Sequence, residues 1–269
     1  MADSSAVSGP VRNSTALSQT ISSRDNALFK ALRVLAHDNA AYKKQARVWV
    51  EGEHLCQAVL AQGLTPALAV FSESFWPPSH ALYAQTATKN IVVPDRLFKE
   101  LSALESPSGF GFVLDLPQSV AIESMAPTVI LDRVQDTGNV GSILRSAAAF
   151  GFCQVLALRG SALLWSPKVL RAGMGAHFGL RLFEGLEMAQ LDALKIPMLA
   201  TSSHVGNFIH RQALPTPCAW VLGHEGQGVN PELLARAAMT VRIAQPGGEE
   251  SLNVAAAAAI CLHASSNSD

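Results

Sequence analysis

The second half of the chain alternates short apolar runs with helical stretches, and this pattern constrains the fold more than any other feature. The runs lie at 129–131, 154–158, 197–201, 219–222 and 241–243. Apolar strands separated by helices are typical of a mostly parallel sheet covered on both faces, so we expect an α/β fold. Such sheets bind ligands beyond the carboxyl ends of their strands, which is where we expect a functional site.

The first half predicts a smaller α/β unit. Helices are predicted from Ala27 to Leu35, at 53–61, after Pro77 and Pro78, and from Pro94 to Leu101, with strands at 48–50, 67–71, 91–93 and 110–116. Residues 1–22 are rich in small polar residues and have no periodic apolar face, which indicates a flexible tail. Residues 117–127 carry a proline at each end and lack a core pattern, as a linker does. We therefore expect a tail at 1–22, a small domain at 23–116, a linker at 117–127 and a second domain at 128–269.

Composition excludes several classes of protein. With 49% hydrophobic and 15% charged residues, the chain can bury a core and is not disordered throughout. Twenty basic and 21 acidic residues nearly cancel, so any nucleic-acid site must be local. The longest apolar run, from Val254 to Leu262, is far shorter than the roughly 20 residues of a membrane-spanning helix. No secretory or transit signal is readable, so we expect a cytoplasmic protein with no membrane partner.

The cysteines predict no metal site. Cys56, Cys153, Cys218 and Cys261 are dispersed, without the close pairs that zinc sites use, and we expect them to be reduced thiols. His54 lies near Cys56, but a buried structural pair is the ordinary interpretation of such a spacing.

Residues 24–47 are locally basic, with six basic residues and two acidic ones. The basic residues are Arg24, Lys30, Arg33, Lys43, Lys44 and Arg47. Binding to RNA phosphates needs a patch of this kind. A solvated helix face is the ordinary alternative.

Three strand-to-loop segments of the second half carry unusual polar residues, and the first spans 131–151. A strand ends at Asp132, and a helix is predicted from about Asn139 to Phe150. Its apolar residues share one face, which leaves Arg145 on the other. Taken alone, Arg145 is an ordinary surface residue and Asn139 an ordinary N-cap.

The second and third segments are rich in small residues. At 220–231 a buried strand opens into three glycines around Glu225, in an order that matches neither the dinucleotide fingerprint nor the P-loop. At 241–264 a strand is followed by Ser251, Asn253 and a helix made largely of alanine. Either residue could cap this helix, which must pack closely against the sheet or a second subunit.

Together these segments closely resemble the three ordered motifs of the SpoU (TrmH) family of RNA ribose methyltransferases, within the SPOUT superfamily. The motifs stand here as NVGSILRSA from Asn139, VLGHEGQG from Val221 and SLNVAAAAA from Ser251, and a further family element stands as SPKVLRAGMGAHF from Ser166. The resemblance covers residues from about 128 to 264. Two positions differ from the usual motif sequences of the family. His224 lies at a variable position, and Gly173 lies where serine is usual.

The resemblance implies an activity and a site. A homodimer would transfer a methyl group from S-adenosylmethionine to a ribose 2′-hydroxyl of structured RNA, with no metal. Arg145 would activate the hydroxyl or stabilise its alkoxide, and Glu225 would be its ion-pair partner. The implied catalytic set is Arg145, Asn139, Glu225, Ser251 and Asn253, and the implied cofactor-binding set is Thr201, Leu222, Gly223, Ile243 and Leu252.

The resemblance also implies a trefoil knot in the second domain and a small α/β/α substrate-binding domain before it. Residues 24–47 lie in that first domain, where RNA contact is expected. Because minimal family members lack such a domain, ribosomal RNA is favoured over transfer RNA. The alternatives are a transfer RNA ribose methyltransferase, a catalytically silent RNA-binding paralogue, and a module that binds another nucleotide without group transfer.

Overall fold

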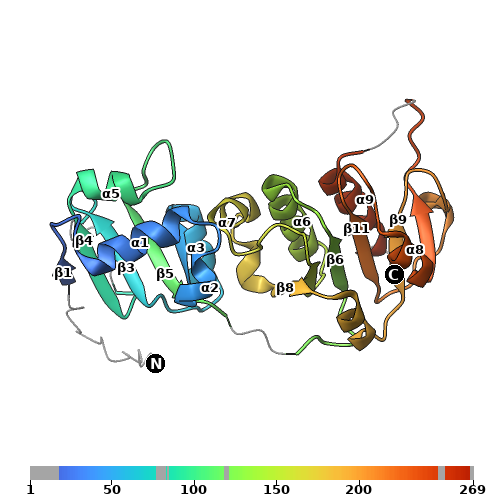
Figure 1. The fold of residues 1–269 in the computed structure, drawn as a ribbon, viewed down its shortest axis with the longest axis horizontal. Coiled ribbons are helices and arrows are strands. Elements are labelled where there is room, and N and C mark those ends of the chain that lie inside the picture. The colour runs from blue at the N-terminus through green and yellow to red at the C-terminus, as the bar shows by residue number, and fades with distance from the viewer. Residues whose placement is uncertain (1–17, 77–82, 84, 118–120, 248–251, 267–269) are drawn as a thin grey trace, which may run out of the picture.

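The computed structural model describes residues 18–76, 83, 85–117, 121–247 and 252–266. Figure 1 shows two α/β units side by side along the long axis of the molecule, with the N-terminal unit in blue and green. Each unit is built around its own sheet. None of the helices within the described ranges is long and apolar enough to cross a membrane.

The described strands of the N-terminal unit form a five-stranded sheet in the order β1-β4-β3-β5-β2. Strand β4 pairs in parallel with β1 and β3, whereas β5 runs antiparallel to β2 and β3. The elements are β1 (Ser18–Thr20), α1 (Ala27–His37), α2 (Ala41–Gln45), β2 (Arg47–Glu51), α3 (Glu53–Ala61), β3 (Leu68–Ser72), β4 (Lys89–Val93), α5 (Asp95–Leu101) and β5 (Phe110–Asp115).

The beginning of this unit differs from the prediction of a flexible segment up to residue 22. Strand β1 pairs with β4, and the amide of Ile21 donates to the carbonyl oxygen of Val92 at 2.9 Å while its side chain is buried. A three-residue edge strand has no periodic apolar pattern, so the prediction is wrong for residues 18–21. Helix α2 was not predicted either, and most of the helix expected after Pro77 and Pro78 falls outside the described residues.

The C-terminal unit is built around a seven-stranded sheet, whose strands have the order β10-β12-β9-β11-β6-β7-β8 over the described residues. Every pairing in it is parallel, which confirms the predicted parallel α/β architecture. The elements are β6 (Thr128–Asp132), α6 (Thr137–Ala149), β7 (Gln154–Leu158), α7 (Pro167–Gly173), η2 (Ala176–Gly179), β8 (Arg181–Leu186), η3 (Met188–Ala193), β9 (Met198–Thr201), β10 (Asn207–Phe208), η4 (Ile209–Arg211), β11 (Ala219–Gly223), α8 (Pro231–Arg236), β12 (Met239–Arg242) and α9 (Val254–Ser266). Strands β8 and β10 were not predicted.

Close packing of α6 on α7 depends on Gly141. A β-carbon built at Gly141 would lie 2.3 Å from the β-carbon of Ala172 on α7, a distance that no real pair of carbons tolerates. The glycine of the NVG string therefore lets the two helices meet. This contact fixes α6, whose first turn carries Asn139, against the rest of the unit.

Helix α9 packs on α6 and β11. Its Ala258, Cys261 and Leu262 are buried, and Ser265 accepts a hydrogen bond from the indole nitrogen of Trp220 at 2.8 Å. Of the two expected alternatives, packing on the sheet or on a second subunit, the structure shows the helix packed on α6 and the sheet.

Part of the expected linker belongs to the C-terminal unit. The side-chain amide of Gln154 donates to the carbonyl oxygen of Glu123 at 2.8 Å, and the amide of Lys195 donates to that of Ser124 at 2.9 Å. Ala126 is buried.

The two units touch through α2, β2 and α3 on one side and α7, η2 and β8 on the other (Figure 1). The hydroxyl of Tyr42 donates to Glu184 at 2.5 Å, and burial together with this carboxylate raises the pKa of Tyr42. A β-carbon at Gly175 would lie 2.4 Å from that of Ala58, so the backbone there lies directly against α3. The N-terminal unit is thus held at a defined place on the C-terminal one.

Candidate active site at the carboxyl edge of the parallel sheet

Four adjacent strands, β12, β9, β11 and β6, end at one edge of the C-terminal sheet. In their registers Gly223 pairs with Asp132, and Thr201 pairs with Val241. Because the strands are parallel, the loops that follow them lie together at this edge. All three sequence motifs are thereby brought to one place.

A chain of hydrogen bonds connects the three motifs. Asn253 donates from its side-chain amide to Oδ1 of Asn139 at 2.9 Å, and Asn139 donates from Nδ2 to Glu225 at 3.2 Å. Oδ1 of Asn253 accepts from the amides of Ala255 and Ala256, so Asn253 caps α9. With partners on both sides, each asparagine amide has one defined orientation.

Glu225 also holds the start of α6. Its carboxylate accepts from the backbone amides of Gln135 at 3.3 Å and Asp136 at 3.1 Å. Burial on its own would raise the pKa of Glu225, but the hydrogen bonds from its own amide, Asp136, Asn139 and Gln135 lower it overall. The carboxylate is therefore ionised at neutral pH, beside the positive end of the α6 dipole.

The N-cap of α6 is Asp136, whose carboxylate accepts from the amide of Asn139 at 2.7 Å. The interpretation of Asn139 as the N-cap is therefore wrong. The helix begins at Thr137, two residues before the predicted start, because the aspartate satisfies the free amide at its end.

His224 closes the glycine-rich loop. Its backbone exchanges hydrogen bonds with Gly228 at 3.1 and 2.8 Å, and its Nδ1 accepts from the amides of Gly226 at 3.0 Å and Gln227 at 3.2 Å. A β-carbon at Gly223 would lie 2.2 Å from the backbone of Gly228, so only glycine permits the loop to fold back this far. The His224 side chain, which differs from those usual at this position in the family, therefore stabilises the turn.

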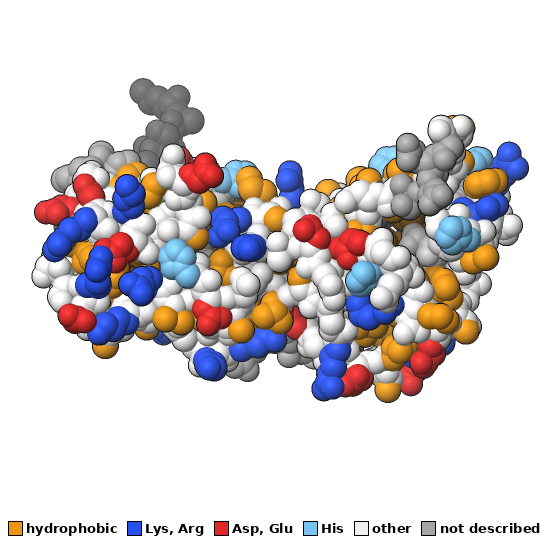
Figure 2. Space-filling model, turned by 45° about the horizontal axis from the view of Figure 1, so that its top comes forward, with side chains coloured by type: hydrophobic (Ala, Val, Ile, Leu, Met, Phe, Trp, Pro, Cys, Tyr) orange, Lys and Arg blue, Asp and Glu red, His pale blue; other side chains and the backbone are white. Residues whose placement is uncertain are grey.

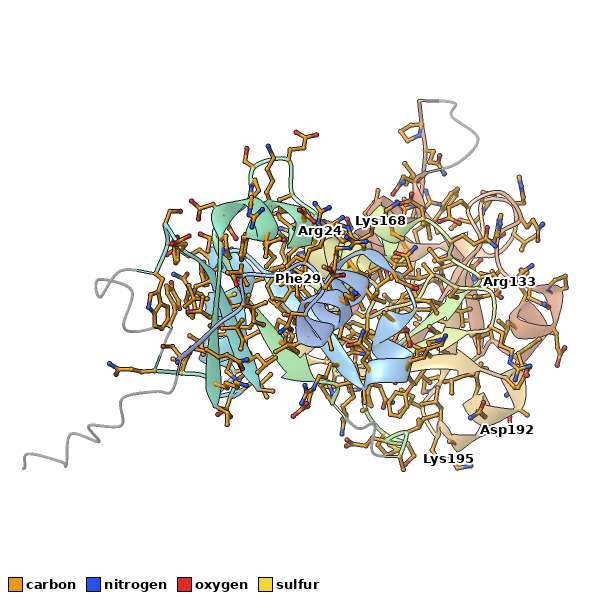
Figure 3. All side chains as sticks on the ribbon, turned by 60° about the vertical axis from the view of Figure 1, so that its left-hand side comes forward. Arg24, Phe29, Arg133, Lys168, Asp192 and Lys195 are labelled. Carbon is orange, nitrogen blue, oxygen red and sulfur yellow. The ribbon has the colours of Figure 1, made fainter. Side chains whose placement is uncertain are left out.

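A second link between β6 and this loop was missed in the sequence. The buried carboxylate of Asp132 accepts two hydrogen bonds from Arg133, at 2.9 and 3.1 Å, and one from the amide of Asn230 at 2.7 Å. Arg133 also donates to Gln227 at 2.8 Å, from a left-handed backbone conformation with φ of 58°. Figure 3 labels Arg133. In the sequence, the only indication of this link was an aspartate followed directly by an arginine at the predicted end of a strand.

Arg145 lies on the exposed side of α6, opposite the buried Val140, Ile143, Leu144 and Ala147, as predicted. It forms no ion pair with any carboxylate in the described part of the chain, and Glu225 is bonded to Asn139 instead. The predicted ion pair between Glu225 and Arg145 is therefore wrong within the described protomer. Ser251 lies outside the described residues.

The predicted cofactor-binding residues follow three neighbouring strands. Thr201 ends β9, Leu222 and Gly223 end β11, and Ile243 follows β12, while Leu252 precedes α9 and is 39% exposed. Leu222 and Gly223 are buried, and Thr201 and Ile243 are half-buried. The strand order brings the first four together at the same edge as the motifs. Over the described residues, no group of His, Cys, Asp or Glu side chains could hold a metal ion.

Most of the predicted RNA-binding residues are engaged with carboxylates. Arg24 and Arg33 both pair with Glu100, the second at 3.9 Å. Lys30 pairs with Asp25 at 2.9 Å, and Arg47 pairs with Asp115 at 2.9 Å. Lys43, which lies 5.8 Å from the ring of Tyr42, and Lys44 form no ion pair to a described carboxylate. Figure 2 shows basic and acidic side chains intermixed on the visible face of this unit.

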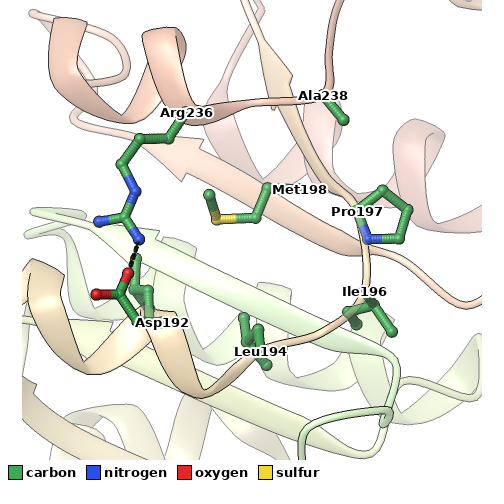
Figure 4. A pocket seen from close by; sticks show the side chains of 8 residues that line it. Asp192, Leu194, Ile196, Pro197, Met198, Arg236 and Ala238 are labelled. Carbon is green, nitrogen blue, oxygen red and sulfur yellow. Dashed lines mark hydrogen bonds and ion pairs between the residues drawn. The ribbon is translucent and has the colours of Figure 1, made fainter.

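A cavity of about 440 Å³ lies away from this edge (Figure 4). It is lined by Met198 and Ala238, at the amino ends of β9 and β12, and by Arg236, which pairs with Asp192. Figure 3 shows Asp192 well apart from Arg133. The cavity therefore belongs to the opposite edge of the sheet.

The fold and the candidate site define a class: an α/β protein whose side-chain amides, backbone groups and ionised Glu225 lie together beyond the ends of parallel strands, where such folds bind ligands. The family model of the SpoU rRNA Methylase family matches residues 126–263, more than half of the chain. The chain belongs to this family.

Three similar proteins extend the match beyond residues 126–263. The chain is 28% identical over 218 residues to the 23S rRNA (guanosine(2553)-2′-O)-methyltransferase RlmP of Bacillus subtilis, covering 80% of this chain and 86% of that protein. A crystal structure of an RNA 2′-O ribose methyltransferase matches with a TM-score of 0.76 and 28% identity, covering 93% of this chain and 99% of that one. An AdoMet-bound rRNA methyltransferase from Sinorhizobium meliloti shares the fold, with a TM-score of 0.79, 22% identity, and coverage of 92% and 97%.

Proposed function

We propose that this chain transfers a methyl group from S-adenosylmethionine to a ribose 2′-hydroxyl of ribosomal RNA. The observation that carries the proposal is the hydrogen-bonded chain from Glu225 through Asn139 to Asn253, which joins the three motifs of the family at one edge. The name of the Bacillus subtilis relative, a 23S rRNA 2′-O-methyltransferase, supports ribosomal over transfer RNA, and the name of the similar crystal structure supports 2′-O ribose methylation of RNA.

The residues at this edge fit S-adenosylmethionine. The amide oxygen of Gln245, two residues beyond Ile243, is buried and has no hydrogen-bond partner among the described residues. Leaving such an acceptor unsatisfied costs free energy, and an adenine amino group would satisfy it. Thr201, Leu222, Gly223, Ile243 and Leu252 would hold the cofactor through backbone and apolar contacts. When bound, the cofactor supplies a methyl group activated on a sulfonium.

Arg145 is the residue that acts on the reacting hydroxyl in this proposal. A guanidinium is a poor base because it stays protonated, so we assign it to stabilising the 2′-oxygen as negative charge develops there. Asn139, Glu225, Ser251 and Asn253 position the RNA and the cofactor. Since Glu225 is bound by Asn139 and backbone amides, its role is to hold α6, on which Arg145 lies.

The remaining parts of the proposal concern assembly. The enzyme is a cytoplasmic homodimer that pairs through α9, with a trefoil knot in residues 128–269. Residues 18–116, which include strand β1, form the RNA-binding domain. The ion pairs of the N-terminal unit leave Lys43 and Lys44 as its candidate phosphate contacts.

The test is methyl transfer from labelled S-adenosylmethionine to ribosomal and transfer RNA isolated from a strain that lacks the gene. We expect label in ribosomal RNA, and a rate about 10² to 10⁴ lower for Arg145→Ala, as for loss of a donor to a developing oxyanion. Cofactor affinity and melting temperature should be unchanged, and Arg145→Lys should recover little because ammonium lacks the planar fork. Arg159→Gln, at an exposed residue paired with Glu187, is the charge-matched control.

Each other outcome contradicts a stated part of the proposal. Label in transfer RNA alone would contradict the substrate, and RNA binding without transfer would indicate the silent paralogue. Wild-type rates in Arg145→Ala would contradict the role of this arginine.

A further inference from the structure

Phe208 and three side chains around it form an aromatic-arginine cluster at the outer edge of the C-terminal sheet. The guanidinium of Arg242 lies 4.6 Å from the centre of the Phe208 ring, and that of Arg211 lies 5.6 Å from it. The ring of His210 stacks beside Phe208, with centres 5.7 Å apart and planes within 22°. One aromatic ring therefore has two cations and a second ring against it.

The cluster lies at the same edge as the motif loops. Phe208 and Arg242 are paired residues of the parallel strands β10 and β12, and each is the last residue of its strand. Ile243, a proposed cofactor-binding residue, directly follows Arg242. Because the carboxyl ends of these strands face the same way as those of β6 and β11, the cluster flanks the candidate active site on the side of β10.

Burial and charge show that the cluster is not part of the core. Arg211 and His210 are exposed, Phe208 and Arg242 are half-buried, and only Ile209 between them is buried. Neither arginine pairs with a carboxylate in the part of the chain that the structure describes, although Arg242 donates to the carbonyl oxygen of Gly206 at 3.0 Å. Figure 2 shows basic, histidine and hydrophobic side chains together at the right-hand end of the molecule, the end formed by the C-terminal unit.

We propose that this cluster is a stacking surface for an unpaired nucleotide of the RNA, next to the ribose that is methylated. Bases stack on aromatic rings and guanidinium planes regardless of sequence, and the two positive charges suit the adjoining phosphates. A second copy of the chain fits less well, because it would bring two more arginines against these two. The inference rests on the proposed function and assigns to it a substrate contact.

The test uses two single substitutions in the full-length protein. Phe208→Leu removes the ring and keeps an apolar side chain, and Arg211→Gln removes one charge whose guanidinium holds no hydrogen bond in the described structure. The probe is a fluorescent single-stranded 12-nucleotide RNA of mixed sequence, compared with a duplex of the same length. We expect Phe208→Leu to weaken binding of the single strand about 5- to 100-fold, as for loss of one stacked base, and the duplex much less.

Arg211→Gln should weaken single-strand binding and reduce its log-log salt slope by up to about 0.7, the value for one phosphate that is no longer neutralised. Arg159→Gln is the control for charge alone. Cofactor binding by calorimetry and the melting temperature should be unchanged in both cluster variants. A photoreactive 4-thiouridine in the probe should crosslink to the segment 203–214.

Unchanged single-strand affinity in both cluster variants, or crosslinks only outside 203–214, would overturn the inference. So would a changed oligomeric state with unchanged RNA binding, which would indicate a subunit contact. Methyl transfer by the wild type is measured in parallel. If transfer is present while the cluster variants bind RNA normally, the inference alone fails; if transfer is absent while binding depends on Phe208, the proposed function alone fails.

Discussion

The imidazole of His177 occupies the space that a side chain at position 173 would need. A β-carbon built at Gly173 would lie 2.4 Å from Cε1 and 2.7 Å from Nδ1 of His177. Nε2 of the same ring donates to the carbonyl oxygen of Leu164 at 2.9 Å, and the ring lies 5.3 Å from that of Trp165. Position 173, at the end of α7, thus has glycine where the family usually has serine, and the His177 ring fills the space that the serine side chain would take.

Restoring the serine that the family commonly has should therefore be harmful here. Gly173→Ser forces the buried ring to move, and we expect a loss of about 1–3 kcal/mol in the free energy of unfolding, typical of overpacking. In a His177→Ala background the serine should cost far less, because the ring is gone. Chemical denaturation of the four proteins of this cycle measures the coupling, which we expect to reach about 0.5–3 kcal/mol. Additive effects would show that the two positions do not interact.

His177 also predicts acid sensitivity. Burial lowers its pKa to about 4, against 6.5 in the unfolded chain, although the carbonyl of Leu164 opposes the shift. Between these values the unfolded chain binds a proton that the folded one does not. Stability should therefore fall as pH drops from 6.5 towards 4, by up to about 1.4 kcal/mol per pH unit, with no contribution from this residue above 6.5.

The measurement is the free energy of unfolding as a function of pH for the wild type and for His177→Gln. A glutamine amide can still donate to Leu164 but does not titrate in this range. A wild-type slope that persists in the variant would assign the acid sensitivity to other groups.

The parallel sheet was predictable because β6, β7 and β11 are buried along their whole lengths and each contains an apolar run. Strand β1, by contrast, is exposed along its length and joins the sheet only through backbone pairing with β4. Backbone pairing leaves no trace in side-chain pattern. Strand β8 was missed because exposed and half-buried residues interrupt its apolar pattern.

The residues of the candidate site were predictable from the sequence, but the hydrogen bonds between them were not. Motif order brought Asn139, Glu225 and Asn253 together, since the loops follow β6, β11 and β12, which end at the same edge of the sheet. Which group accepts from which depends on side-chain rotamers, and Glu225 turned out to bind the start of α6 rather than Arg145. No regular spacing in the sequence predicts the cluster around Phe208, because a two-residue strand and a short 3₁₀ helix bring its residues together.

The N-terminal unit offers a direct test of RNA contact at Lys43 and Lys44. Replacing both by alanine should weaken binding of ribosomal RNA and reduce its log-log salt slope by about 0.9 for each phosphate that is no longer neutralised. Lys30→Ala is the control, because Lys30 already pairs with Asp25. Anisotropy titrations at several salt concentrations give both slopes. If the double variant keeps the wild-type slope, the phosphates bind elsewhere.

Assembly through α9 can be tested at Ile260, which is 40% exposed on this helix. Ala258 is fully buried within the protomer, so a charge there would destabilise the fold instead of reporting on assembly. We expect a dimer in light scattering at micromolar concentration and a monomer for Ile260→Glu, because an unpaired charge is costly in a buried contact. The melting temperature, measured at several protein concentrations, should then lose its dependence on concentration. Val34→Glu, at a residue 48% exposed on α1, is the matched control and should stay dimeric. A monomeric wild type, or an Ile260→Glu variant that stays dimeric, would show that the subunits do not pair through this face of α9.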